Sequence, residues 1–148
     1  MRCTMLLILA VVLPATGLSA KINHRGRPAK PVTLATAVMP KGDSARGKTL
    51  YQACTGCHSL DQNEIGPKHR GVVGRHSAIV PGYAYSAALK QSGIVWTPAM
   101  IDRWLTNPQK LVPSAKMFFS VSNPQNRADI IAYLAEQSKA ESASGSGQ

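Results

Sequence analysis

The sequence is poor in long apolar runs, in cysteine and in acidic residues. Its most apolar segment, from Met5 to Leu13, is well short of the roughly 20 residues that cross a bilayer as a helix. Arg2 precedes this segment, Pro14 ends it, and small residues lead to Ala20. This order is typical of a secretory signal peptide. We therefore expect residues 1–20 to be removed on export, to the periplasm or elsewhere outside the cytoplasm, leaving no transmembrane span; an uncleaved anchor is the alternative.

Cysteine is scarce as well. Cys3 would leave with the signal peptide, and the two remaining cysteines, Cys54 and Cys57, are separated by only two residues. Exported proteins usually pair cysteines over longer distances, as structural disulfides. No second Cys or His pair completes a set of four zinc ligands, which argues against a structural zinc site.

Acidic residues are outnumbered, 7 against 17 basic residues. Residues 21–42 contain three prolines and five basic residues but no acid and no aromatic, a composition typical of a disordered basic linker. Residues 138–148 are rich in Ser, Gly and Ala and are expected to form a disordered, solvated tail. Residues 43–137 remain as the one folded domain.

This domain has ten basic and six acidic residues, a net charge of +4. Such an excess of basic residues could bind nucleic acid, anionic lipid or an acidic protein partner. Because the chain is expected to be exported and shows no patterned basic and aromatic surface, nucleic acid is disfavoured. We expect a monomer that meets acidic protein surfaces.

The segment Cys54-Thr55-Gly56-Cys57-His58 has the C-x-x-C-H pattern of haem attachment. Two thiols must add to two vinyl groups of one porphyrin, and a helical turn with two intervening residues gives the sulfurs a suitable separation. His58 then lies beneath the iron as its proximal ligand. A thioredoxin-like redox pair would need a βαβ context. We therefore expect one covalent haem, held by Cys54, Cys57 and His58.

An electron-carrying haem needs a sixth iron ligand. The candidates are Met39, Met100, Met117, His24, His69, His76 and Lys116. Met39 and His24 lie in the linker, where ordering the chain costs about 1–2 kcal/mol per residue. Met100 falls inside a predicted helix, where such a side chain usually packs. Met117 follows a Pro-led loop after that helix, and its thioether suits an iron that alternates between two oxidation states. We expect Met117 to be the ligand.

Capping residues and apolar spacing predict helices rather than strands. The helices cover residues 43–51, 84–91, 97–107 and 123–137. The first starts at Asp43 as its N-cap, the third has Pro98 at its first helical position, and the last has apolar residues at helical spacing. Gly47 has no side chain, so Tyr133 could cross the first helix closely. We expect an all-α domain with long loops around the haem.

From Gly42 to Leu134, the order and spacing of several short motifs resemble the class I cytochromes c of the small bacterial type, which are close to mitochondrial cytochrome c. The motifs are Gly42-Asp43 with Gly47, the C-x-x-C-H segment, Gly66-Pro67 with residues 71–75, residues 81–86, Trp96, residues 104–108, Val112-Pro113 with Lys116-Met117, and residues 127–134. The resemblance implies the class I cytochrome c fold, all-α with three to five helices around one covalent haem c. It also implies a one-electron carrier with a low-spin His/Met iron, and not an enzyme.

The resemblance further assigns roles to individual residues. It implies that the Pro67 carbonyl accepts the Nδ1 proton of His58. It implies that the haem propionates bind Arg75, Tyr85, Ser86 and Trp96, for which ordinary packing is the alternative. The chain departs from the family at His69, where leucine is usual, and at Ala115, where a threonine hydroxyl is usual. His69 could be a surface residue, a partly buried donor or a competing ligand. The missing hydroxyl would weaken the Met117 bond.

Three functions remain open. The first is a mobile electron carrier, of the kind that serves a respiratory chain, with a basic rim for docking. Its candidate lysines are Lys48, Lys68, Lys90, Lys110 and Lys116. The second is a subunit fixed to one oxidoreductase or to an anionic membrane through residues 21–42. The third is a haem enzyme or ligand sensor, which would need an open sixth position; the methionine-bearing loop argues against it.

Overall fold

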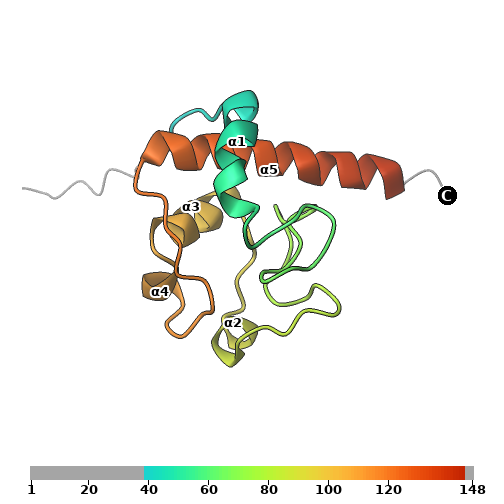
Figure 1. Cartoon of the computed structure of the whole chain (residues 1–148), viewed down its shortest axis with the longest axis vertical. Coiled ribbons are helices and arrows are strands. Elements are labelled where there is room, and N and C mark those ends of the chain that lie inside the picture. Colours follow the sequence, from blue (N-terminus) through green and yellow to red (C-terminus); the bar gives the residue numbers. More distant parts are fainter. Residues whose placement is uncertain (1–38, 146–148) are drawn as a thin grey trace, which may run out of the picture. The chain divides into compact units, whose positions relative to one another are not determined.

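Helices and long loops make up the part of the chain that the computed structural model describes, residues 39–145. The elements are α1 (Ser44–Leu50), a 3₁₀ helix η1 (Tyr51–Cys54), α2 (Ala87–Gln91), α3 (Pro98–Thr106), α4 (Pro108–Leu111) and α5 (Pro124–Gly145) (Figure 1). Within residues 39–145 the only β-type pairing is an isolated antiparallel bridge between His76 and Val95. The expected all-α fold class is confirmed.

The predicted helix starts follow from their caps. The Asp43 carboxylate accepts a hydrogen bond from the Arg46 backbone N–H at 2.9 Å and begins α1. The Thr97 hydroxyl accepts from the Met100 N–H at 3.2 Å, and Pro98 takes the first helical position of α3. Such caps satisfy backbone donors that have no partner within the helix. The first helix tightens to 3₁₀ geometry at Tyr51, directly before the C-x-x-C-H motif.

Helix α4 was not predicted, because Pro108 was interpreted only as the end of the preceding helix. The Asn107 backbone is extended, with φ −165° and ψ 99°, and this breaks the chain between α3 and α4. Its side chain then accepts from the Lys110 N–H at 2.9 Å, and Pro108 occupies the first position of the new helix. One asparagine therefore ends one helix and caps the next.

Helix α5 extends beyond the end predicted for it. We expected it to stop near Gln137, but it continues to Gly145, so residues 138–145 are helical and not an irregular tail. Residues 125–144 contain no Pro or Gly, the two residue types that most disfavour a helix interior. The Ser138 hydroxyl donates to the Leu134 carbonyl at 2.9 Å and accepts from the Val73 N–H at 3.1 Å. No helix in the described part of the chain is both long and apolar enough to cross a membrane.

The end of the expected basic linker packs on the domain, which corrects the prediction for residues 39–42. Met39 is partly buried against the core, and the Gln125 amide donates to the Lys41 carbonyl at 2.9 Å. A side chain at Gly42 would lie 2.2 Å from the Ala128 carbonyl oxygen. The rest of the linker, with His24, and the expected signal peptide lie outside the described residues.

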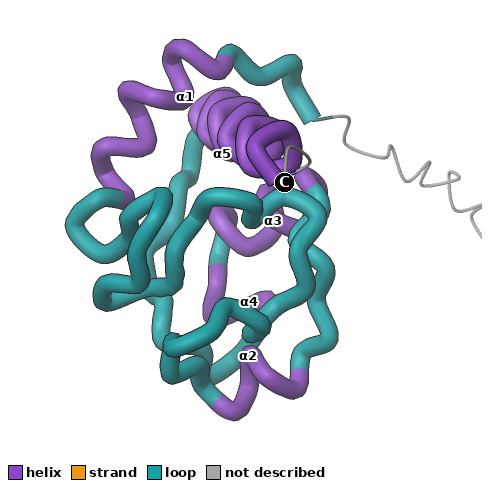
Figure 2. The backbone as a smooth tube through the Cα atoms, turned by 90° about the vertical axis from the view of Figure 1, so that its right-hand side faces the viewer, coloured by secondary structure: helices purple, strands orange, loops and turns teal. Residues whose placement is uncertain are grey.

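The close crossing of α1 and α5 is the centre of the packing. Figures 1 and 2 show α1 running across α5. A Cβ at Gly47 would lie 2.0 Å from the Asp129 carbonyl oxygen and 2.9 Å from the Tyr133 Cβ, so only glycine allows this approach, as predicted. The buried core around the crossing includes Tyr51, Trp96, Ile101, Leu105, Ile130, Ile131 and Leu134.

Polar side chains fix the helices around that core. The buried Asp129 carboxylate accepts from Arg46 Nε at 2.9 Å and Nη2 at 3.0 Å, and from the Asp43 N–H at 2.8 Å. These hydrogen bonds, above all those from Arg46, hold the pKa of Asp129 well below its usual value. Arg127 on α5 pairs with Asp102 on α3 at 2.7 Å. Both contacts position the helices that surround the site.

Candidate functional site

A cavity of about 450 Å³ opens between α3, α5 and the loops. Its wall is mainly aliphatic and aromatic, and it includes every site residue that the sequence predicted: Cys54, Cys57, His58, Pro67, Arg75, Tyr85, Ser86, Trp96 and Met117. These residues come from segments more than sixty positions apart in the chain. The fold therefore brings the two thiols, the imidazole and the thioether to one apolar space.

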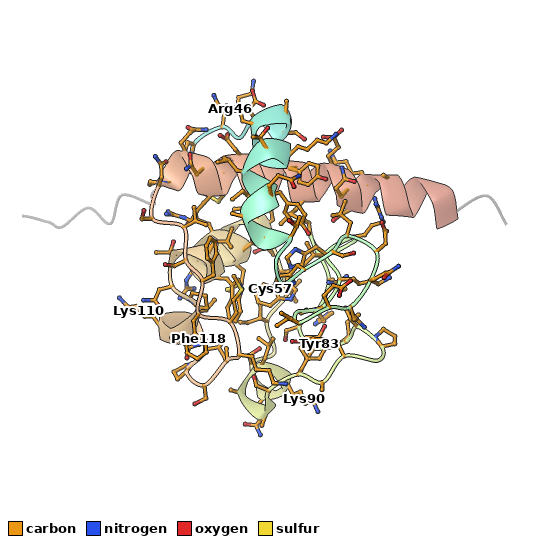
Figure 3. The ribbon with its side chains drawn as sticks, viewed as in Figure 1. Arg46, Cys57, Tyr83, Lys90, Lys110 and Phe118 are labelled. Carbon is orange, nitrogen blue, oxygen red and sulfur yellow. The ribbon has the colours of Figure 1, made fainter. Side chains whose placement is uncertain are left out.

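The C-x-x-C-H segment forms a single helical turn. The backbone N–H groups of Cys57 and His58 both donate to the Cys54 carbonyl, at 3.1 and 2.9 Å. The two cysteines form no disulfide with each other; Cys54 is partly buried and Cys57 is exposed, near the middle of the view in Figure 3. Burial raises the pKa of Cys54 to about 11. The turn gives the two sulfurs the spacing that the motif predicts.

The His58 ring is fixed by the loop that follows the motif. Its Nδ1 lies 2.8 Å from the Pro67 carbonyl oxygen, the hydrogen bond that the family resemblance implied. Because a carbonyl only accepts, Nδ1 carries the proton and Nε2 keeps its lone pair for a metal. A Cβ at Gly66 would lie 2.1 Å from the His58 Cε1. Burial also lowers the pKa of His58, which favours the neutral ligand form.

His69 is stacked on that same imidazole. The two ring centroids are 3.9 Å apart and the planes differ by 21°. The His69 Nδ1 lies 3.1 Å from the hydroxyl of the buried Tyr51. Burial lowers the pKa of His69 well below its usual value, so the ring is neutral. Of the three interpretations left open by the sequence, the structure supports a partly buried hydrogen-bonding group, which lies beside the predicted proximal ligand His58.

Met117 receives support that the sequence analysis missed. The indole N–H of Trp104 donates to the Met117 sulfur at 3.1 Å, although Trp104 was predicted only as part of a helix and of the family-like segment 104–108. The Gln109 amide donates to the carbonyls of Ala115 and Met117, both at 2.8 Å. These bonds join the methionine loop to α3 and α4. The loop carries Ala115 at the position where the family usually has a threonine hydroxyl. No local sequence pattern signalled these contacts, because each joins a helix residue to a loop residue six or more positions later.

The four predicted propionate partners lie in the cavity wall but differ in what they contact. Arg75 donates to the carbonyls of Lys68 and Arg70, at 2.8 and 2.9 Å. The Ser86 hydroxyl caps α2 by accepting from the Leu89 N–H. Trp96 packs edge-on against Trp104, at 5.3 Å between centroids. The Trp96 ring is largely buried and lines the cavity.

The mouth of the cavity is more apolar than the predicted basic rim. Of the five lysines, only Lys116 is part of the cavity wall; its ammonium donates to the Ala84 carbonyl and lies 5.9 Å from the centre of the Tyr83 ring. Phe118 and Ile65 also line the cavity and are 76% and 75% exposed. Figure 3 shows Lys90 and Lys110 toward the periphery of the same view.

The donor set fits a covalently held haem. Two thiols on one turn can form thioethers, a neutral imidazole nitrogen and a thioether sulfur can ligate iron, and an apolar wall can exclude water. Among the described residues, no cluster of three or more His, Cys, Asp or Glu side chains could hold a metal ion by itself. The two thiols, the imidazole and the thioether suit a metal that is held within a covalently attached macrocycle.

Comparisons with known proteins agree with this geometry. The Cytochrome c family model matches residues 44–138. Cytochrome c2 of Rhodopila globiformis is 50% identical over 99 residues, which cover 64% of this chain and 93% of that protein. Cytochrome c2 of Rhodomicrobium vannielii is 41% identical over 100 residues, with 65% and 80% covered. The solved structure of cytochrome cH from Methylobacterium extorquens superposes with a TM-score of 0.63 and 43% identity, covering 64% of this chain and 99% of that chain.

Proposed function

Because the chain belongs to the cytochrome c family, whose members carry one covalent haem c and transfer electrons rather than catalyse reactions, we propose that it is an exported, mobile one-electron carrier. In this proposal His58 and Met117 are the axial ligands of a low-spin iron. Cys54 and Cys57 form the thioether links. The signal peptide at residues 1–20, a linker that ends before Met39, and a folded domain from Met39 to the end of α5 are part of the same proposal.

One observation carries the proposal: a single apolar cavity presents an imidazole whose Nδ1 proton is already engaged, together with a thioether. The Pro67 carbonyl holds the His58 proton at Nδ1, so Nε2 is the only nitrogen left to ligate. The Trp104 N–H takes up one lone pair of the Met117 sulfur, and the other is left for a metal. A nitrogen and a soft sulfur are the donors of an electron-transfer haem.

When bound, the haem supplies the one-electron ferrous–ferric couple. The chain's own residues bind and orient it, and they hold the two ligands still. Pro67 fixes the proximal imidazole, and Gln109 fixes the backbone on both sides of Lys116 in the methionine loop. Buried Ile101, Leu105 and Leu134 in the cavity wall exclude water. Ligands that are held in this way stay in place in both oxidation states, which suits rapid electron exchange.

The haem edge and its surroundings would meet the partner. The domain's excess of basic over acidic residues supports a redox partner with an acidic docking surface, as in a respiratory chain. The exposed Phe118 and Ile65 beside Lys116 would add apolar contact at the centre of that surface. Export is supported by the N-terminal sequence pattern.

An optical spectrum of the haem-loaded, ferric protein tests the ligation. We expect a low-spin spectrum with the weak methionine-to-iron charge-transfer band. A parent protein that is high-spin, or that binds cyanide or carbon monoxide without delay, would overturn the carrier proposal in favour of a haem enzyme or ligand sensor.

A second experiment separates a mobile carrier from a subunit that is fixed through the linker. Deleting residues 21–38, which stops short of the packed Met39, should leave the thermal midpoint and the electron-transfer rate with an acidic redox partner nearly unchanged. Loss of a stable, salt-sensitive complex with a partner or with anionic vesicles on this deletion would favour the fixed subunit.

A further inference from the structure

The stacked pair His58 and His69 is not explained by haem attachment or by the Pro67 hydrogen bond. We propose that His69, held in place by Tyr51, is a positioning residue that sets the rotation of the His58 ring about its bond to iron. The proposal rests on His58 being the proximal ligand, as proposed above, but it does not depend on Met117.

The first step is that the Pro67 bond alone leaves one motion open. It holds a single atom of the ring, Nδ1, at 2.8 Å from a carbonyl oxygen. The ring can still swing out of its plane with only a small change in that distance, because hydrogen bonds tolerate such angles. The His69 ring covers the face of the His58 ring, with 3.9 Å between the centroids and 21° between the planes, and so restricts this motion.

The second step is that His69 is itself rigid. Its backbone N–H donates to the Ser59 carbonyl at 2.9 Å, one residue after the ligand that it covers. Arg75 donates to the carbonyls of Lys68 and Arg70, so its guanidinium holds the backbone on both sides of His69. The ring therefore sits on a backbone fixed at three consecutive residues.

The third step is that Tyr51 fixes the His69 side chain. The Tyr51 residue is 3% exposed, its ring packs against Tyr133 at 5.3 Å, and its hydroxyl lies 3.1 Å from the His69 Nδ1. Without His69 this buried hydroxyl would lose its hydrogen-bond partner, a costly arrangement. The leucine that is usual in the family at this position could fill the space, but it offers neither a flat face nor a partner for the hydroxyl.

The consequence concerns the electronic structure of the iron. The plane of an axial imidazole selects the iron d orbital with which its π system overlaps, and so determines how unpaired spin spreads over the four pyrroles of ferric haem. Partners of metal-ligating histidines orient the ring and tune the metal in general. Here the orienting group is a second imidazole, stacked on the first.

The test uses the full-length, haem-loaded ferric protein and the variants His69→Leu and Tyr51→Phe. The readouts are the hyperfine-shifted haem methyl resonances in proton NMR and the electron paramagnetic resonance g values. We expect His69→Leu to change the spread of the methyl shifts and the g anisotropy. Tyr51→Phe should change both in the same direction but less, because it keeps the stacked ring and removes only its hydrogen bond.

Ile131→Val is the matched control for simple destabilisation, because Ile131 is buried in α5 but does not line the cavity. It should lower the thermal midpoint and leave the methyl shifts unchanged. Parent-like methyl shifts and g values in His69→Leu would overturn the inference; if that variant fails to load haem, parent-like values in Tyr51→Phe would do so. If the parent protein lacks the methionine-to-iron band, the proposed function is wrong. The test of His69 would still be valid, because it concerns His58 and not Met117.

Discussion

The indole nitrogen of Trp104 lies 3.1 Å from the sulfur of Met117 and donates a hydrogen bond to it. Trp104 is on α3, and Met117 is in the loop after α4, so the bond joins a helix to the loop that carries the proposed iron ligand. A thioether sulfur has two lone pairs. The indole takes one of them and thereby directs the other, and it also draws electron density from the sulfur.

Replacing Trp104 with Phe should lower the reduction potential. The variant keeps an aromatic ring in α3 but removes the donor, so the sulfur gives more electron density to the iron and stabilises its ferric form. A redox titration against the parent measures the effect, and the methionine-to-iron band should persist. An unchanged or higher potential would show that Trp104 only packs.

Replacing Met117 with Ala should abolish the methionine-to-iron band and lower the reduction potential, since a thioether favours ferrous iron over water or an amine. Met100→Ala is the matched control and should keep both, because Met100 is not among the residues that line the cavity. Lys116 could occupy the vacated position and keep the iron low-spin, so spectra and potentials must be read together. The ligand assignment is wrong if the two variants behave the other way round.

Replacing Gly66 with Ala should displace the proximal imidazole. The added methyl would lie 2.1 Å from His58 Cε1, whereas a methyl at Gly56 meets nothing within 4 Å. We expect Gly66→Ala to lose about 1–3 kcal/mol of unfolding free energy or more, in the range of overpacked sites, and to load haem poorly. Gly56→Ala should resemble the parent in thermal midpoint and haem yield. Equal behaviour of the two variants would contradict the close approach seen here.

Acid should destabilise the domain through Asp129. Its folded pKa is depressed by Arg46 and the other donors, so the folded state binds fewer protons than the unfolded one. This contribution is fully present above the unfolded pKa of about 4 and is lost as the pH falls through the lower folded pKa. Thermal midpoints between pH 7 and pH 2 should fall steeply in the parent. In Asp129→Asn the midpoint should start lower and fall less; an identical slope in both proteins would refute this role.

The helix boundaries were predictable where they depend on neighbouring residues. Asp43 and Thr97 cap helices through hydrogen bonds to residues three positions later, and such spacing is visible in a sequence. The extension of α5 was not predictable in the same way. Ser138 is bound to Val73, sixty-five positions away, and a Ser-rich and Ala-rich end gives no local sign of that contact.

The site residues also differ in whether a local sequence pattern reveals them. The motif at Cys54 to His58 and the loop methionine could be identified from the sequence, because each stands in a local pattern. The contacts of Trp104 and His69 could not, because the side chain that each one meets lies in another segment of the chain. Each is defined by a contact with another segment. The Trp104 indole nitrogen lies 3.1 Å from the Met117 sulfur, and the centroids of the His69 and His58 rings lie 3.9 Å apart.

The segments that carry the proposed ligands His58 and Met117 are held by different kinds of hydrogen bond. Around His58, Gly66, His69 and Arg70 donate backbone hydrogen bonds to the carbonyls of Cys57, Ser59 and Leu60, at 2.7 to 2.9 Å. Met117 and its carbonyl are held instead by the side chains of Trp104 and Gln109. If haem is held as proposed, we expect local opening to begin in the methionine loop, whose amides should exchange first, and a small molecule to reach the iron from that side.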